Sequence, residues 1–141
     1  MTAIIQKLKS QPISLYSVYV IVYLSVGFIM NYIGITFEIA RFENWWQVVT
    51  CYGLYMIPVS VWLLGKPVFR QYAYGLVAMG LLEFSGYALH TSYVYPNNIL
   101  VEWFSPYTFA LVMAMFFAAY FPIGNWAVER IHDRLFLIHI K

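Results

Sequence analysis

The chain has 141 residues, of which 62% are hydrophobic and only 10% are charged, and its formal net charge is +2. Soluble globular domains usually carry about 25% charged residues, so this composition argues against a soluble domain. The small net charge and the lack of a basic run argue against nucleic-acid binding. We therefore expect an all-α integral membrane protein whose surface faces lipid or other protein.

Four apolar segments have the length of a membrane-spanning helix, which needs roughly 17 to 25 mostly apolar residues. These spans are predicted at 13–36, 45–64, 69–93 and 106–126. The predicted loops are short, and short connections make consecutive helices antiparallel neighbours. The sequence thus predicts a single transmembrane domain over residues 1–141, built as a four-helix up-and-down bundle.

The first span, 13–36, is far longer than the apolar core of a signal peptide, and no small-x-small cleavage site follows it, so we expect it to be retained. One stripe of this helix consists of Tyr16, Tyr19, Tyr23, Gly27 and Asn31. In the simpler interpretation these tyrosines pack the bundle and bond to backbone carbonyls. In the other interpretation they line a cleft that holds a flat or polyene ligand.

The second span, 45–64, has clear signals at both of its ends. Asn44 is a favoured residue for capping a helix N-terminus, while Gly65 followed by Pro67 ends a helix. A second aromatic-rich stripe consists of Tyr52, Tyr55, Val59 and Trp62.

The third span, 69–93, carries a carboxylate at membrane depth. Glu83 lies near the middle of this apolar stretch, and an ionisable residue there is by default a candidate functional site. Its helical face also carries Gly80, Gly86, Tyr87 and His90. We predict that Glu83 faces the bundle interior or a subunit interface, and not lipid. There it carries a proton, contacts a ligand, or joins helices by bonding to Asn31 or a tyrosine hydroxyl.

His90 is the only histidine within a predicted span. At 1.5 Å per residue, it lies about 10 Å from Glu83 along the helix axis, which is too far to share one metal ion. The single cysteine, Cys51, excludes a multi-cysteine metal site and an internal disulfide. We expect no metal site, and no phosphate loop, HExxH or GxSxG motif indicates a catalytic site.

The fourth span, 106–126, begins with Ser105 and Pro106, a capping residue followed by proline at the first helical position. Apolar residues then recur at three- and four-residue spacing in the tail, 127–141, which predicts an amphipathic helix. The apolar face of this tail consists of Val128, Ile131, Leu135 and Ile138. We expect the tail to lie on the inner membrane surface or to dock on a partner.

The basic residues predict the orientation of the chain, because Lys and Arg are enriched in cytoplasmic loops. Seven of the eight fall on one side of the predicted spans: Lys7, Lys9, Lys66, Arg70, Arg130, Arg134 and Lys141. Only Arg41 falls on the other side. Both termini are therefore predicted on the cytoplasmic or equivalent side of the membrane.

Three functions remain open on this pattern. The first, which we favour, is an accessory subunit of a larger membrane complex of respiratory, photosynthetic or oxidase type, with lipids and other membrane subunits as partners. The second is a lipid- or isoprenoid-binding or -modifying protein that uses Glu83, His90, Asn31, Tyr23 and Tyr87 and holds a lipid, quinone or pigment. The third is an oligomeric proton-coupled transporter with Glu83 as the proton carrier. The chain on its own is not expected to be an enzyme.

Overall fold

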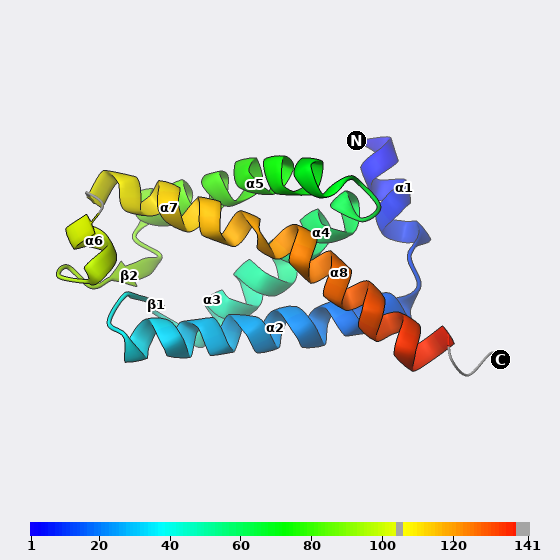
Figure 1. Ribbon diagram of the computed structural model, residues 1–141, viewed down its shortest axis with the longest axis horizontal. Helices are drawn as coiled ribbons and strands as arrows, with labels where there is room; N and C mark the ends of the chain where they lie inside the picture. The colour runs from blue at the N-terminus through cyan, green and yellow to red at the C-terminus, as the bar shows by residue number, and fades with distance from the viewer. Residues whose placement is uncertain (104–105, 138–141) are drawn as a thin grey trace.

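The computed structural model describes residues 1–103 and 106–137, apart from the side chains of Tyr87, Ser92, Pro106 and Tyr107. This part of the chain is mostly helical (Figure 1). Its α-helices are α1 (Thr2–Ser10), α2 (Ile13–Thr36), α3 (Trp45–Val48), α4 (Ile57–Leu63), α5 (Val68–Leu89), α6 (Ile99–Trp103), α7 (Pro106–Ala118) and α8 (Tyr120–His132). Two π-helical segments, η1 (Val49–Met56) and η2 (Asp133–Leu137), and two strands, β1 (Ala40–Phe42) and β2 (Ser92–Val94), complete it.

Three helical stretches in the described residues are long and apolar enough to cross a membrane. They are Ile13–Thr36, Trp45–Leu63 and Thr108–Leu137, with 24, 19 and 30 residues. The prediction of a mostly helical chain with apolar helices long enough to cross a membrane is confirmed. The predicted third span corresponds to α5, which has 22 residues and packs along α7 (Figure 1). That α5 is a fourth span stays a prediction.

The second long helix is continuous from α3 through η1 to α4. Asn44 is its N-cap, as predicted, and the backbone N–H of Asn44 donates to Gln47 Oε1 at 2.8 Å. Pro58 has no N–H to donate, and its ring crowds the preceding turn, so the wide π-helical turns fall just before it. The helix ends where predicted, because Gly65 adopts a φ of 78°.

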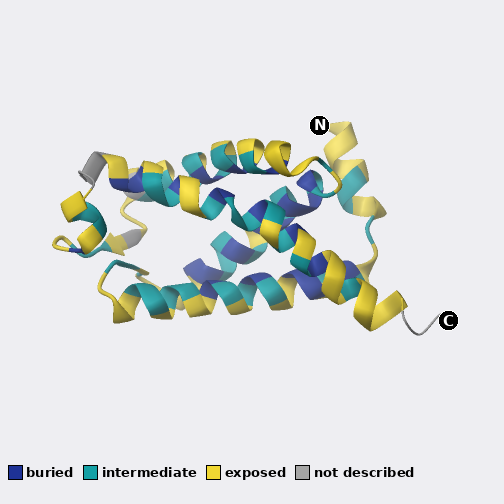
Figure 2. Ribbon diagram, in the orientation of Figure 1, coloured by how far each residue is buried: buried dark blue, intermediate teal, exposed yellow. Residues whose placement is uncertain are grey.

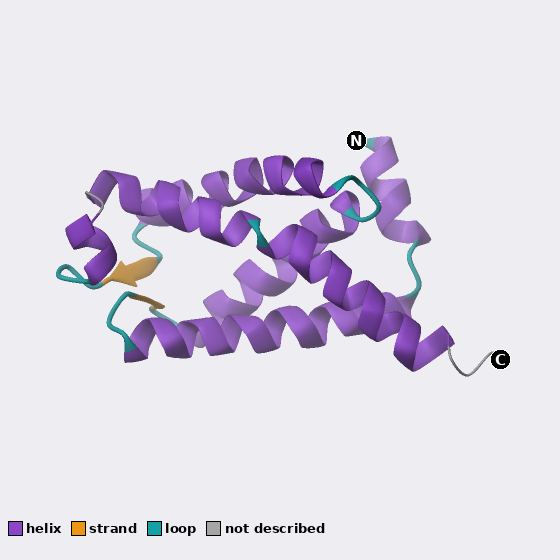
Figure 3. Ribbon diagram, in the orientation of Figure 1, coloured by secondary structure: helices purple, strands orange, loops and turns teal. Residues whose placement is uncertain are grey.

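The fourth long helix is interrupted at Ala119, between α7 and α8 (Figure 3). Pro122 cannot donate to the carbonyl oxygen of Ala118, so the helix breaks there. Gly75 of α5 packs against this break, since a Cβ at Gly75 would collide with the Phe121 ring and lie 3.2 Å from the Ala118 oxygen. Beyond the break, α8 runs to His132 across the predicted boundary at 126, so the tail is not a separate helix.

One end of the bundle carries α1, which the sequence did not predict. α1 packs against α4. The Lys7 ammonium donates to the carbonyl oxygens of Trp62, at 3.2 Å, and of Leu64. A cation beside the last carbonyls of a helix is favourable. Burial and then the nearby charge of Lys66 lower the pKa of Lys7.

The opposite end of the bundle is closed by a small antiparallel sheet that was also not predicted. β1 and β2 pair with Arg41 opposite Tyr93. α5 ends at Leu89, four residues before the predicted end, because His90 adopts a left-handed φ of 52° and the chain then enters β2. Asn31 Oδ1 accepts the backbone N–H of Phe42 at 3.0 Å, which ties β1 to α2.

The buried core follows the tyrosine stripe of the first span (Figure 2). Tyr19, Tyr23 and Gly27 are buried in α2, as the packing interpretation of this stripe predicted. Gly27 is required by a close approach, because a Cβ there would lie 2.7 Å from the Tyr52 ring. α2 therefore packs closely against η1.

Candidate functional site

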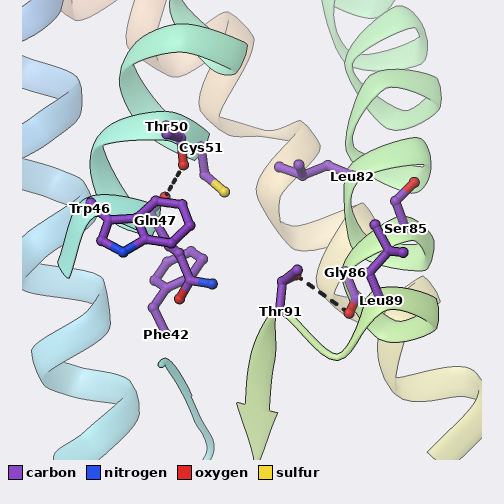
Figure 4. A pocket seen from close by; sticks show the side chains of 10 residues that line it. All are labelled: Phe42, Trp46, Gln47, Thr50, Cys51, Leu82, Ser85, Gly86, Leu89 and Thr91. Carbon is purple, nitrogen blue, oxygen red and sulfur yellow. Dashed lines mark hydrogen bonds between the residues drawn. The ribbon is translucent and has the colours of Figure 1, made fainter. Parts of the chain in front are cut away.

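A cleft of about 230 Å³ lies between the second long helix and the C-terminal half of α5 (Figure 4). Its walls come from elements that pack elsewhere, because η1 packs on α2 while α5 packs mainly on α7. The lining residues are Phe42, Trp46, Gln47, Thr50, Cys51, Leu82, Ser85, Gly86, Leu89 and Thr91. None of these ten side chains carries a charge, so the cleft suits a neutral and mostly apolar occupant.

The first wall is built by the N-terminal turns of the second long helix. Thr50 Oγ1 donates to the Gln47 carbonyl oxygen at 3.0 Å, which fixes Thr50 on the helix surface. The Cys51 thiol extends from η1 toward Leu82 across the cleft (Figure 4). The π-helical turns thus present Thr50 and Cys51 to the cleft while Tyr52 packs on Gly27.

Gln47 is the most informative side chain of this wall, and it is 8% exposed. Its Oε1 accepts the Asn44 N–H, which identifies the other amide atom as the nitrogen. Nε2 makes no hydrogen bond within the part of the chain that the structure describes. Every side-chain nitrogen or oxygen of the described residues that is fully enclosed has a hydrogen-bond partner. The unpaired Gln47 nitrogen is therefore not fully enclosed, and it faces the open cleft.

Glu83 lies close to this cleft on α5 but does not line it. Its side chain is half-buried, and it is near enough to Cys51 and Tyr52 to act on both electrostatically. Among the described residues, no hydrogen bond or ion pair reaches its carboxylate. In particular, it does not bond to Asn31, which holds β1 instead. Of the two bridges that the sequence allowed, the described residues do not form the one to Asn31, and a bridge to a tyrosine hydroxyl stays a prediction.

The other predicted ligand residues are not gathered around Glu83. Tyr23 is buried in the core, and its hydroxyl is 2.6 Å from Ser60 Oγ. His90 follows the end of α5 and is exposed, so its predicted place inside a span is wrong. The Tyr87 side chain lies outside the described residues.

The structure buries one residue of the predicted docking face of the tail and leaves two others exposed. Val128 is fully buried against the bundle, so it cannot contact a partner. Ile131 and Leu135 are 38% and 57% exposed. Ile138 lies outside the described residues. The exposed apolar residues instead continue along η2, through Phe136 and Leu137.

A buried polar network joins four helices in the half of the bundle that carries α1. Tyr19 of α2 donates to Asn125 Oδ1 at 2.6 Å. Asn125 Nδ2, on α8, donates to the Ser60 carbonyl oxygen of α4 at 3.1 Å and to Gln71 Oε1 of α5 at 2.8 Å. This network was missed because Gln71 and Asn125 fall near the ends of predicted spans, where polar residues are ordinary. The available signal was one uncharged polar residue near the end of each of two predicted spans, Gln71 in the third and Asn125 in the fourth.

The network has no free polar group and does not open into the cleft, so it fixes helix positions. Gln71 Nε2 completes it by donating to the Lys66 carbonyl oxygen at 2.7 Å in the α4–α5 turn. No group of three His, Cys, Asp or Glu side chains in the described chain has the geometry of a metal site. Comparisons with protein-family models, with curated proteins and with solved structures find no match for this chain.

Proposed function

We propose that the chain crosses the membrane four times, with both termini on the inner side. The spans are α2, the α3–η1–α4 helix, α5, and the α7–α8 helix. Support comes from the end of the bundle that carries α1, the α4–α5 turn and the last turns of α8 (Figure 1). Six basic residues of the described chain lie in these segments, in the first turn of α5 or in η2: Lys7, Lys9, Lys66, Arg70, Arg130 and Arg134. Such an excess marks the cytoplasmic side.

We propose further that the protein is an accessory subunit that docks on a larger membrane complex. One observation carries this proposal, the apolar surface of η2. His132 Nε2 lies 3.0 Å from Ser14 Oγ, so the end of α8 meets the start of α2 at the inner end of the bundle. η2 continues past this contact with Leu135, Phe136 and Leu137 each about half exposed. Asp133 and Arg134 are beside them, which fits a helix end at the membrane interface that a partner subunit covers.

Replacement of Leu135 tests this proposal. We expect the natural chain to migrate in native gels of gently solubilised membranes with a large complex, and Leu135→Glu to release it as a small particle. Arg134→Gln is the control, because it changes the same segment without removing apolar area. A natural chain that always migrates alone would overturn the proposal. So would a Leu135→Glu variant that stays in the complex.

A second function, the binding of a lipid-like ligand, is favoured by the uncharged cleft between η1 and α5. The unpaired Gln47 amide nitrogen supplies this cleft with a hydrogen-bond donor. The two functions are compatible, since the cleft lies toward the outer half of the bundle and η2 lies at the inner end.

A further inference from the structure

We infer that the cleft between η1 and α5 binds the ring of a neutral, quinone-like molecule whose oxygen accepts a hydrogen bond from Gln47 Nε2. This inference deepens the second function and rests on it, but it does not depend on the accessory-subunit proposal. It assigns the ligand a ring, a hydrogen-bond acceptor and an apolar tail.

The hydrogen-bond acceptor follows from the state of the Gln47 amide. The side chain is nine-tenths buried, and its oxygen is already engaged by the Asn44 N–H. Its NH₂ group points from α3 into the space between the two walls (Figure 4). A donor that faces an apolar site without a partner is unfavourable, and a carbonyl or hydroxyl oxygen of a ligand would supply the missing hydrogen bond.

The size of the occupant follows from the volume of the cleft. The cleft measures about 230 Å³. A cavity of about 150 Å³ is enough to hold benzene, while sites for whole drug-sized ligands measure about 300–1,000 Å³. The cleft therefore accommodates one substituted ring. The rest of the molecule would extend out of the cleft between η1 and α5.

The chemical class follows from the lining. Phe42 and Trp46 supply aromatic rings on one side, and Leu82 and Leu89 supply aliphatic groups on the other. Aromatic rings favour stacked or edge contacts with a flat ring. A phospholipid headgroup would need charged partners, and the ten lining residues provide none. A neutral ring with an oxygen acceptor satisfies both the apolar walls and Gln47.

Binding of decylubiquinone to the purified full chain tests this inference. The readout is quenching of tryptophan fluorescence, since Trp46 lines the cleft. We expect saturable quenching for the natural chain. Cys51→Phe fills the cleft and should abolish saturation. Leu54→Phe places the same ring on the same π-helical segment at a position 74% exposed to the outside, and should bind normally.

Gln47→Met tests the hydrogen bond separately, because it keeps the length of the side chain, adds no charge and removes the NH₂ donor. We expect about a tenfold weaker affinity, the equivalent of about 1.4 kcal/mol. This variant decides the question if Cys51→Phe does not fold. Decylbenzene, which has a ring and tail but no oxygen, should compete poorly.

Four results would overturn the inference. They are unsaturable quenching of the natural chain, normal binding by a folded Cys51→Phe variant, unchanged affinity of the folded Gln47 variant, and displacement of decylubiquinone by decylbenzene at an equal concentration. The last result would identify a slot for any apolar chain. Co-migration of these variants with a large complex should not change, so failure of ligand binding is distinguishable from failure of the accessory-subunit proposal.

Discussion

The Asn125 side chain makes hydrogen bonds to residues of three other helices, and it is 1% exposed. Interhelical hydrogen bonds in membrane proteins are worth about 0.6–2 kcal/mol each. Asn125→Leu leaves the Tyr19 hydroxyl and the Gln71 oxygen without this partner. We expect it to lower the free energy of unfolding by roughly 1–3 kcal/mol, measured by denaturation with SDS in mixed micelles.

Asn97→Leu is the matched control for this prediction, because Asn97 is exposed in the outer loop and should tolerate the change. Equal stability of the two variants would show that the network does not hold the helices together.

Replacement of Glu83 should change the stability little, in contrast to Asn125, because no described residue bonds to the Glu83 carboxylate. We predict that Glu83→Gln and Glu83→Ala both fold, with the Gln variant within about 0.5 kcal/mol of the natural chain. If the carboxylate serves a proton or an outside partner, both variants lose that activity while still entering the membrane. A Gln variant that folds while the Ala variant unfolds would identify Glu83 as a structural bridge instead.

At the scale of elements, the contact between α5 and the break in the fourth long helix depends on one glycine. Gly75 touches Phe121 and the Ala118 carbonyl, whereas a Cβ at Gly80 of the same helix would meet nothing within 4 Å. We expect Gly80→Ala to stabilise the protein by up to about 1 kcal/mol through helix propensity. Gly75→Ala should destabilise it by about 1–3 kcal/mol through overpacking.

Thermal unfolding in the same detergent measures both glycine variants. If Gly75→Ala were as stable as Gly80→Ala, α5 would not pack on α8 as the structure places it.

Among the elements, helix bounds could be predicted from the sequence, whereas the strand pairing could not. The first two predicted spans follow from the length of the apolar segments and from residues that start or end helices. α2 has its predicted bounds, and Asn44 and Gly65 mark the ends of the second long helix. These signals are local, so a single sequence carries them. The pairing of β1 with β2 is different, because it joins segments about fifty residues apart and each strand has only three residues.

The candidate site was only partly predictable for a related reason. Periodicity identified Glu83 and the tyrosine stripe, since both lie within regular helix. His90 was placed on the Glu83 face by assuming that the helix continues, but its left-handed backbone ends α5 first. Nothing in the sequence singles out Gln47. Its amide nitrogen is known to be unpaired only from the structure, in which the Asn44 N–H donates to the amide oxygen.

At the scale of the whole molecule, the described chain has polar and basic segments at one end and the small sheet with α6 at the other (Figure 1). An even number of long helices explains why α1 and η2 share an end. The cleft lies toward the end that carries the sheet, and the proposed docking surface on η2 lies at the opposite end.

Cysteine labelling in intact and opened membranes tests this arrangement most directly. In a Cys51→Ala background, a cysteine replaces Ser10 in one variant and Asn97 in another, both at exposed positions. We expect an impermeant maleimide to label Asn97→Cys from the outside and Ser10→Cys only after the membrane is opened. Labelling of both positions from the same side would contradict the four-span bundle, and with it the placement of the docking surface and the cleft.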